Sequence, residues 1–303
     1  MKPKPHRAIT PKKALDVWRE YSKFRQGQVA VSTFKRDYTK FTRRLEKMAQ
    51  AAPSLESSIE IRDWLLAHYS AEVSRRTLVQ LAASSRWALE SDMLTTNPFE
   101  GLQRQIRQKR PSDKAWAAFT TQERDRIIQE FEVSDPFYAP WVKFLFWTGC
   151  RPEEAAALRW EHISGDCTEL LFSEAAPVDT RDIQGTKNGK TTRFPCNARL
   201  QRLLREIKPA TAARGDRIFQ GMRGDTFNYH NFQTRNWKPL VERLVKEGKV
   251  AFYLSQYHCR HTWITAALEH LAVADVGYLA RVSTAVIYQH YAGRSRHLNI
   301  PEF

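Results

Sequence analysis

Four short segments in the second half of the chain carry side chains whose types could act together on a phosphate group. The first is WTGCRPEEAAALRW, in which Arg151 follows a glycine turn and Glu154 lies three residues further along the same helical face. A guanidinium at this place can bind two phosphate oxygens while the carboxylate holds its other nitrogens. Taken alone, such a pair is more often a surface salt bridge, so its meaning depends on the other segments.

The next two segments supply further cationic groups. TKNGKTTRFP predicts a β-hairpin because Asn-Gly favours a tight turn, and Lys187 and Lys190 flank that turn. An ammonium group at a hairpin tip can act as a positive charge or, with a lowered pKa, as a proton donor. YHCRHTWIT places Arg260 between His258 and His261 near a predicted helix start, although a structural role is the commoner one for each histidine.

The fourth segment, TAVIYQHYAG, holds Tyr288 and Tyr291 on a short predicted helix. A tyrosine there is normally a packing residue, and neither one alone indicates a nucleophile. Attack on a phosphodiester needs positive charge at the non-bridging oxygens, an in-line nucleophile and a proton for the leaving oxygen. Arginine, tyrosine and lysine can supply these, because nearby guanidinium groups favour ionisation of a phenol whose ordinary pKa is about 10.

The charge of the chain also indicates a polyanionic partner. Its 48 Lys and Arg against 33 Asp and Glu give a net charge of +15. Residues 1–113 hold 22 basic and 12 acidic side chains, a net +10, whereas residues 114–303 hold 26 and 21, a net +5. Solubility alone is the simpler explanation, but the net charge of a small domain is usually below about 8. The imbalance therefore favours nucleic acid, with the N-terminal third as a DNA clamp.

The composition of the chain excludes several other classes of protein. Hydrophobic residues make up 42% and charged residues 27%, as in soluble globular proteins. The longest apolar stretch, around residues 141–147, contains Lys143 and is too short to span a membrane. With no signal peptide visible, we expect a cytoplasmic protein without a membrane partner. We expect no metal and no cofactor, because the four cysteines lack ligand or disulfide spacing: Cys150, Cys167, Cys196 and Cys259.

The 303 residues favour two domains. We expect residues 1–110 to form a helical domain. In this domain Thr10 is the expected cap of a helix that begins with proline, and Ser74 is the expected cap of a later helix. The charged, proline-containing stretch from Gln103 to Trp116 predicts an exposed linker.

Residues 117–303 predict the second domain, in which Thr120 and Glu123 have capping-box spacing. Helices are expected before and after a glycine turn, the second from Pro152 to Trp160. Short β-like runs, TELLF and TTRFP, fall in residues 169–195, and helices resume after them. The expected fold class is mostly α with a small β-sheet, α+β.

The order of the four segments resembles the catalytic domain of the tyrosine recombinase (phage integrase) family. The family pattern consists of an arginine with an acidic partner, a hairpin lysine, an arginine followed by His-Thr, and a tyrosine after histidine. The resemblance covers about residues 115–295, and residues 1–110 resemble the family's helical core-binding domain in composition and length. It implies four catalytic residues: Arg151, Lys187, Arg260 and Tyr291.

The resemblance implies a site-specific DNA recombinase or integrase that cuts and rejoins strands through a 3′-phosphotyrosyl link to Tyr291. Lys187 would protonate the 5′-oxygen that leaves, and the link conserves bond energy, so that religation needs no ATP. The implied partners are a double-stranded DNA attachment site, a homo-tetramer in the synaptic complex, and an accessory DNA-bending or directionality factor.

Two positions depart from the family pattern. Tyr257 stands where the family often has histidine, and Val282 stands where it usually has histidine or tryptophan, with Arg281 beside it. Tyrosine can still donate a hydrogen bond to phosphate, whereas valine cannot, so either Arg281 replaces that contact or the contact is dispensable. We expect supporting roles for Glu154, Tyr257, His258 and Arg281, and a structural role for His261.

Two other functions remain as alternatives at this point. A DNA-binding regulator could keep the fold without the chemistry, which the two departures from the pattern would explain. A relaxing enzyme of the type IB topoisomerase kind would use similar chemistry without bringing two DNA sites together.

Overall fold

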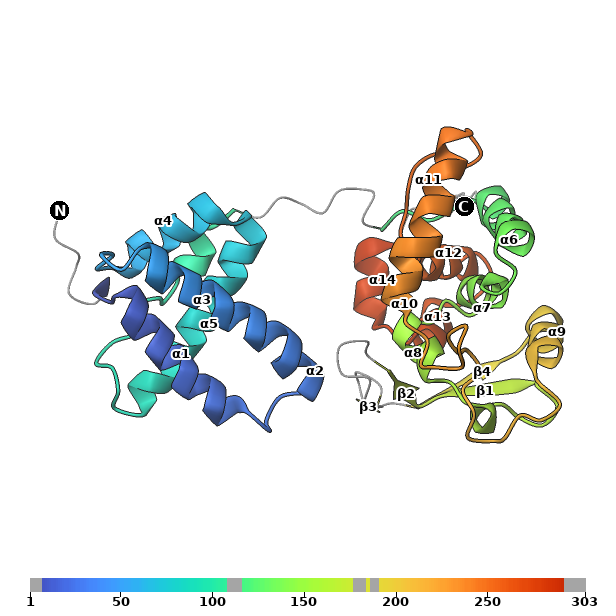
Figure 1. Ribbon diagram of the computed structural model, residues 1–303, viewed down its shortest axis with the longest axis horizontal. Helices are drawn as coiled ribbons and strands as arrows, with labels where there is room; N and C mark the ends of the chain where they lie inside the picture. Colours follow the sequence, from blue (N-terminus) through green and yellow to red (C-terminus); the bar gives the residue numbers. More distant parts are fainter. Residues whose placement is uncertain (1–6, 108–115, 177–183, 186–190, 292–303) are drawn as a thin grey trace, which may run out of the picture. The chain divides into compact units, whose positions relative to one another are not determined.

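The computed structural model describes residues 7–107, 116–176, 184–185 and 191–291. The chain divides into two compact units, residues 1–110 and residues 111–303 (Figure 1). None of the helices in the described ranges is both long and apolar enough to cross a membrane.

The N-terminal unit is helical. Its core forms where α1 packs against α3 and α5, around the buried side chains of Trp18, Leu45 and Leu78. A π-helical turn, Phe34–Tyr38, leads directly into α3. The α-helices are α1 (Pro11–Arg25), α2 (Val31–Thr33), α3 (Thr39–Ala51), α4 (Ser58–His68) and α5 (Ala71–Glu90).

Capping residues fix the helix starts in this unit. The prediction for Thr10 is confirmed, because its side chain accepts the N–H of Lys13 at the start of α1. The prediction for Ser74 is wrong. Helix α5 begins one turn earlier, where Ser70 is the cap, and the buried Ser74 hydroxyl donates instead to the Leu65 carbonyl oxygen at 2.9 Å.

The C-terminal unit sets a small β component against many helices, as the sequence predicts. Strand β1 (Glu169–Phe172) pairs with β4 (Thr192–Pro195), antiparallel, with Leu170 opposite Phe194. A second short pair joins β2 (Glu174–Ala175) to β3 (Gln184–Gly185). The α-helices are α6 (Thr121–Ser134), α7 (Ala139–Thr148), α8 (Pro152–Ala157), α9 (Ala198–Ile207), α10 (Tyr229–Phe232), α11 (Lys238–Lys246), α12 (His258–Ala267), α13 (Val273–Ala280) and α14 (Thr284–His290).

Helix α6 begins with the predicted capping box of Thr120 and Glu123, which is confirmed. The predicted end of α8 is wrong, because the helix stops at Ala157. Leu158 is extended, and its carbonyl oxygen accepts the N–H of Ile218 at 3.0 Å. The Trp160 N–H likewise bonds to the loop after α9. Pairing with this distant loop uses backbone groups that a longer helix would need.

The predicted linker is shorter at both ends than Gln103–Trp116. Ile106 is buried in the core of the N-terminal unit. Trp116 is half-buried and packs on a small cluster in the C-terminal unit that includes Ile264, Ile287 and Tyr291. Residues 108–115 lie outside the described residues.

Candidate functional site

A left-handed glycine at the end of α7 sets the direction in which the first arginine segment leaves. Gly149 has φ 59°, and its N–H closes α7 on the Leu145 carbonyl oxygen at 3.0 Å. A Cβ atom at this position would lie 2.8 Å from the side chain of Trp263. Two requirements therefore favour glycine here, the backbone conformation and the close approach of α12.

Arg151 is the residue that precedes α8, and Glu154 holds it in two ways. One Glu154 oxygen accepts the Arg151 backbone N–H at 2.8 Å, and the other accepts Arg151 Nη1 at 2.7 Å. Arg151 Nη2 donates to the carbonyl oxygen of Arg281 at 3.0 Å. The Arg-x-x-Glu spacing thus starts the helix and orients the guanidinium at the same time.

Arg260 lies in the first turn of α12 and is 3% exposed. Its Nη1 donates to the Gly149 carbonyl oxygen at 2.9 Å, and its Nη2 donates to the Ala280 carbonyl oxygen. Arg260 and Arg151 therefore bind consecutive carbonyl groups at the end of α13. The structure brings together two arginines that lie 109 positions apart in the sequence (260 − 151).

Arg281 ends α13 in the left-handed conformation, with φ 55°, where glycine is the usual residue. Its Nε donates to Glu154 at 3.0 Å, its Nη1 donates to the Leu279 carbonyl oxygen at 2.7 Å, and its guanidinium lies 3.9 Å from the centre of the Phe172 ring. These contacts compensate for the backbone strain. They direct the Arg281 side chain to protein groups.

The site holds an excess of positive charge. Three guanidinium groups, those of Arg151, Arg260 and Arg281, surround the single buried carboxylate of Glu154. Burial works against the Glu154 charge, but Arg281 and Arg151 outweigh it and lower its pKa. Burial and the neighbouring Arg151 lower the pKa of Arg260 to about 10. Such a group of cations favours binding of an anion.

The two tyrosines of the fourth segment differ in exposure. Tyr291 follows α14 and is 3% exposed, and its hydroxyl contacts Nδ1 of the buried His261. Tyr288, on α14, is 63% exposed. The predicted nucleophile is thus enclosed in the core, while its neighbour one turn earlier is open to solvent.

The remaining predicted residues lie near this site. Tyr257 immediately precedes α12 and is 40% exposed, with its ring 5.4 Å from that of His261. His258 Nδ1 lies 3.0 Å from the Ser255 hydroxyl. Val282 is half-buried and donates its N–H to the Gly277 carbonyl oxygen at 3.0 Å.

Lys187 and Lys190 lie outside the described residues. Within the ranges that the structure describes, no group of three or more His, Cys, Asp or Glu side chains could hold a metal ion.

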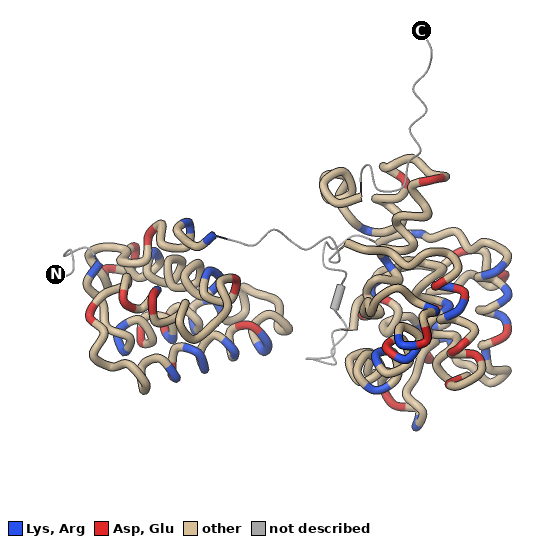
Figure 2. Tube along the Cα trace, turned by 90° about the horizontal axis from the view of Figure 1, so that it is seen from above, with Lys and Arg blue, Asp and Glu red and all other residues tan. Residues whose placement is uncertain are grey.

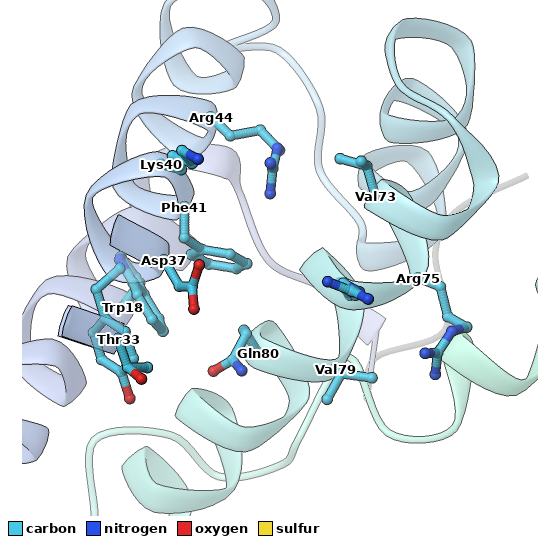
Figure 3. Close-up of a pocket in the computed structure, with 12 residues that line it drawn as sticks. Trp18, Thr33, Asp37, Lys40, Phe41, Arg44, Val73, Arg75, Val79 and Gln80 are labelled. Carbon is cyan, nitrogen blue, oxygen red and sulfur yellow. The ribbon is translucent and has the colours of Figure 1, made fainter. Parts of the chain in front are cut away.

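The N-terminal unit has a groove of about 480 Å³ between α3 and α5 (Figure 3). Aromatic and aliphatic side chains form part of its wall. Arg44 reaches across from α3, where its Nη1 donates to the Thr77 hydroxyl at 2.9 Å. The described cationic side chains that line the groove are Lys40, Arg44, Arg75 and Arg76, against the single carboxylate of Asp37.

No family model and no curated protein matches the chain, but several solved structures match it. A Tn1549 transposon integrase in complex with a circular intermediate DNA has a TM-score of 0.76 and 16% identity, over 92% of this chain and 95% of that one. The chain has the tyrosine recombinase fold. A lambda integrase dimer bound to a COC′ core site has a TM-score of 0.69 and 15% identity, over 99% and 84% of the two chains. A lambda integrase tetramer bound to a Holliday junction has a TM-score of 0.66 and 12% identity, over 97% and 80%.

Sequence reasoning missed two features of this recombinase fold. The first is the contrast between Tyr288 and Tyr291, for which helical periodicity across Ile287 and Tyr291 was an available signal. The second is Trp116, whose ring stacks on His290 at 3.7 Å. No local pattern predicts this contact, because the partners lie 174 positions apart (290 − 116).

Proposed function

We propose that the chain is a site-specific DNA recombinase or integrase that cleaves and rejoins DNA strands through a 3′-phosphotyrosyl intermediate. One observation carries the proposal, namely that Arg151 and Arg260 converge on the end of α13 within a tyrosine recombinase fold. A guanidinium has five N–H donors, and the contacts described above occupy only some of them. The two arginines are therefore suited to bind the non-bridging oxygens of one phosphate.

In the proposed reaction, the tyrosine hydroxyl releases its proton to water, its oxygen attacks phosphorus, and the bond from phosphorus to the 5′-oxygen breaks. The 3′-phosphate becomes esterified to tyrosine, and the 5′-oxygen takes up a proton to leave as a hydroxyl. Lys187 is the proposed donor of that proton, on the strength of the sequence resemblance alone. A second 5′-hydroxyl reverses the step, so that joining needs no energy source.

The surroundings of Tyr291 and Tyr288 bear on which of the two is the nucleophile. The sequence favours Tyr291, but its hydroxyl contacts Nδ1 of the buried His261, so the attacking oxygen would have to leave this contact before it could reach a DNA phosphate. Tyr288 is 63% exposed, and α14 begins three residues after Arg281, whose carbonyl group binds Arg151 (284 − 281). We therefore propose Tyr288 as the nucleophile, with Tyr291 as the alternative to be tested.

The supporting residues divide into two groups in this proposal. Glu154 and Arg281 are proposed to orient Arg151 from within the protein, because Arg281 donates to Glu154 and its carbonyl oxygen accepts from Arg151. In this proposal the phosphate contact that Val282 lacks is dispensable. Tyr257 is exposed beside α12 and His258 is half-buried, so both are candidates for contact with the phosphate.

We propose residues 1–110 as the core-binding domain, which clamps DNA, and residues 117–303 as the catalytic domain. Residues 11–51, which span α1 to α3, hold 11 basic and 4 acidic side chains, and Figure 2 shows Lys and Arg along the helices of this unit. The groove between α3 and α5 continues this positive surface, because four cationic side chains and one carboxylate line it. Contacts with phosphates are its proposed role.

The proposed partners are a double-stranded DNA attachment site, further copies of the chain in a synaptic tetramer, and an accessory DNA-bending or directionality factor, in the cytoplasm. The lambda integrase tetramer bound to a Holliday junction supports the tetramer by similarity of fold.

The test uses duplexes enriched from a randomised pool for binding to the chain, each then nicked in one strand so that a cleaved end is lost and religation fails. Wild type should form a covalent protein–DNA adduct on a denaturing gel, and Tyr291→Phe should still form it while Tyr288→Phe should not. Binding without an adduct on every enriched duplex would favour the DNA-binding regulator. An adduct lost only in Tyr291→Phe would return the nucleophile to the position that the sequence favours.

A further inference from the structure

An aromatic cluster joins the beginning of the C-terminal unit to the helix that carries Tyr288. The Trp116 ring is stacked on His290, with centroids 3.7 Å apart and planes 8° apart. The same indole meets Tyr291 edge-on at 5.7 Å and His261 at 5.1 Å. One side chain from the start of the unit thus contacts both α12 and the end of α14.

The cluster also links α14 to the helix that carries Arg260. His261 directly follows Arg260 on α12, is 4% exposed and contacts the Tyr291 hydroxyl through Nδ1. The Arg260 side chain in turn binds Gly149 and Ala280. A displacement of α14 relative to α12 would break the His261 contact.

Helix α14 needs such contacts because it is short. It spans seven residues, of which Ile287 is the buried one. An isolated helix of this length is unstable in water, so its position depends on packing. Ser283 caps its start, while the stack of Trp116 on His290 and the buried Tyr291 hold its end.

We propose that Trp116 is a positioning residue for the nucleophile helix, acting through its stack on His290 to fix Tyr288 for attack. This inference rests on the proposed function. Tyr288 lies two positions before His290, so a shift at the end of α14 moves its hydroxyl. In-line attack tolerates little displacement, and an error of about 1 Å can lower a rate by about 100-fold. Trp116 itself touches no reacting atom.

The experiment measures single-turnover adduct formation at saturating nicked duplex, DNA affinity and thermal stability for the full chain. Trp116→Leu should lower the adduct rate by about 100-fold with DNA affinity unchanged. Trp116→Phe, which keeps a flat ring, should recover most of the rate. If Trp116 were merely structural, the adduct rate would follow thermal stability, and Trp116→Leu and Trp116→Phe would react at the same rate whenever they were equally stable.

The N-terminal unit offers a matched control, because Trp64 stacks on His68 with centroids 4.1 Å apart and planes 20° apart. Trp64→Leu makes the same chemical change at a similar stack and should leave the adduct rate unchanged. Equal rates for Trp116→Leu and Trp64→Leu would overturn the inference.

His290→Ala removes the other half of the stack at a half-buried position, which keeps the inference testable if Trp116→Leu does not fold. It should lower the adduct rate by a similar factor. In the double variant of Trp116 and His290 the losses should not multiply, because both remove one contact. Full activity of His290→Ala would contradict the inference. Absence of any adduct with wild type would instead reject the proposed function.

Discussion

The buried charge at Arg260 has to be satisfied by protein groups until an anion binds. Two carbonyl oxygens accept its hydrogen bonds, and Glu154 lies close enough to favour its charge. Burial nevertheless lowers its pKa to about 10, so at neutral pH the guanidinium remains charged. Arg151 is more exposed and is held directly by Glu154. In the proposed phosphate site, Arg260 is the deep contact and Arg151 is the shallow one.

Arg151→Lys should lower the rate of adduct formation by at least about 100-fold, because a lysine cannot make two parallel hydrogen bonds to a phosphate. Single-turnover cleavage of the nicked duplex measures this. Arg202→Lys, an exposed position on α9, is the matched control and should react as wild type does. A retained rate in Arg151→Lys would remove Arg151 from the site.

Glu154→Gln should destabilise the fold by about 3 kcal/mol, because it leaves two guanidinium groups without their shared carboxylate. Glu154 has a pKa below its ordinary value despite burial, owing to Arg281 and Arg151. The stabilisation that the Glu154 carboxylate provides is therefore fully present above the pKa of glutamate in the unfolded chain, about 4.3. It is lost as the pH falls through the lower pKa of Glu154 in the folded protein. Urea unfolding should show that the difference in the free energy of unfolding between wild type and Glu154→Gln becomes smaller at acidic pH. A difference independent of pH would contradict this account.

At the residue level, local spacing predicted the contact between Arg151 and Glu154, because three positions on a helix are neighbours. It could not predict the role of Arg281, which depends on a left-handed conformation at the end of α13 and on Phe172 from β1. Spacing from Ile287 was a signal that Tyr291 is the buried tyrosine, but its contacts with His261 and Trp116 could not be predicted locally.

Among the elements, the turn at Gly149 has the largest effect on the site. Its carbonyl oxygen binds Arg260, its successor Cys150 leads to Arg151, and Trp263 of α12 leaves no room for a side chain. The sequence predicted a turn here but not the neighbour that requires glycine. Capping residues predicted the starts of α1 and α6 but misplaced the start of α5 by one turn. The end of α8 was misplaced because it depends on distant backbone partners.

Gly149→Ala should destabilise the fold by about 2 kcal/mol, since alanine is strained at φ 59° and its Cβ meets Trp263. Thermal or urea unfolding measures the change. Gly165→Ala is the control, because nothing lies within 4 Å of its added Cβ and its φ is not positive. Equal stability of the two variants would show that the turn tolerates a side chain.

Across the whole molecule, charge and length predicted a basic helical unit followed by an α+β unit. The groove between α3 and α5 was not predictable, because it depends on how Arg44 packs against Thr77 and the Tyr69 ring. Long-range packing of this kind is not encoded in a local pattern.

Lys40→Gln should weaken DNA binding and reduce the slope of log affinity against log salt by about 0.9, the value for one phosphate contact on duplex DNA. Fluorescence anisotropy across a salt series measures both. Lys249→Gln is the control, because Lys249 is exposed, pairs with Glu247 and lies outside both the groove and residues 11–51. A slope unchanged by Lys40→Gln would exclude this residue from phosphate contact.

The covalent link between tyrosine and DNA is tested most directly by identifying the bond in a trapped protein–DNA adduct. After nuclease and trypsin digestion, mass spectrometry of the peptide that spans residues 282–294 should find a nucleotide 3′-phosphate on Tyr288, and the released strand should carry a 5′-hydroxyl. A nucleotide on any side chain other than a tyrosine of this peptide, or a 5′-phosphate on the released strand, would contradict the proposed chemistry.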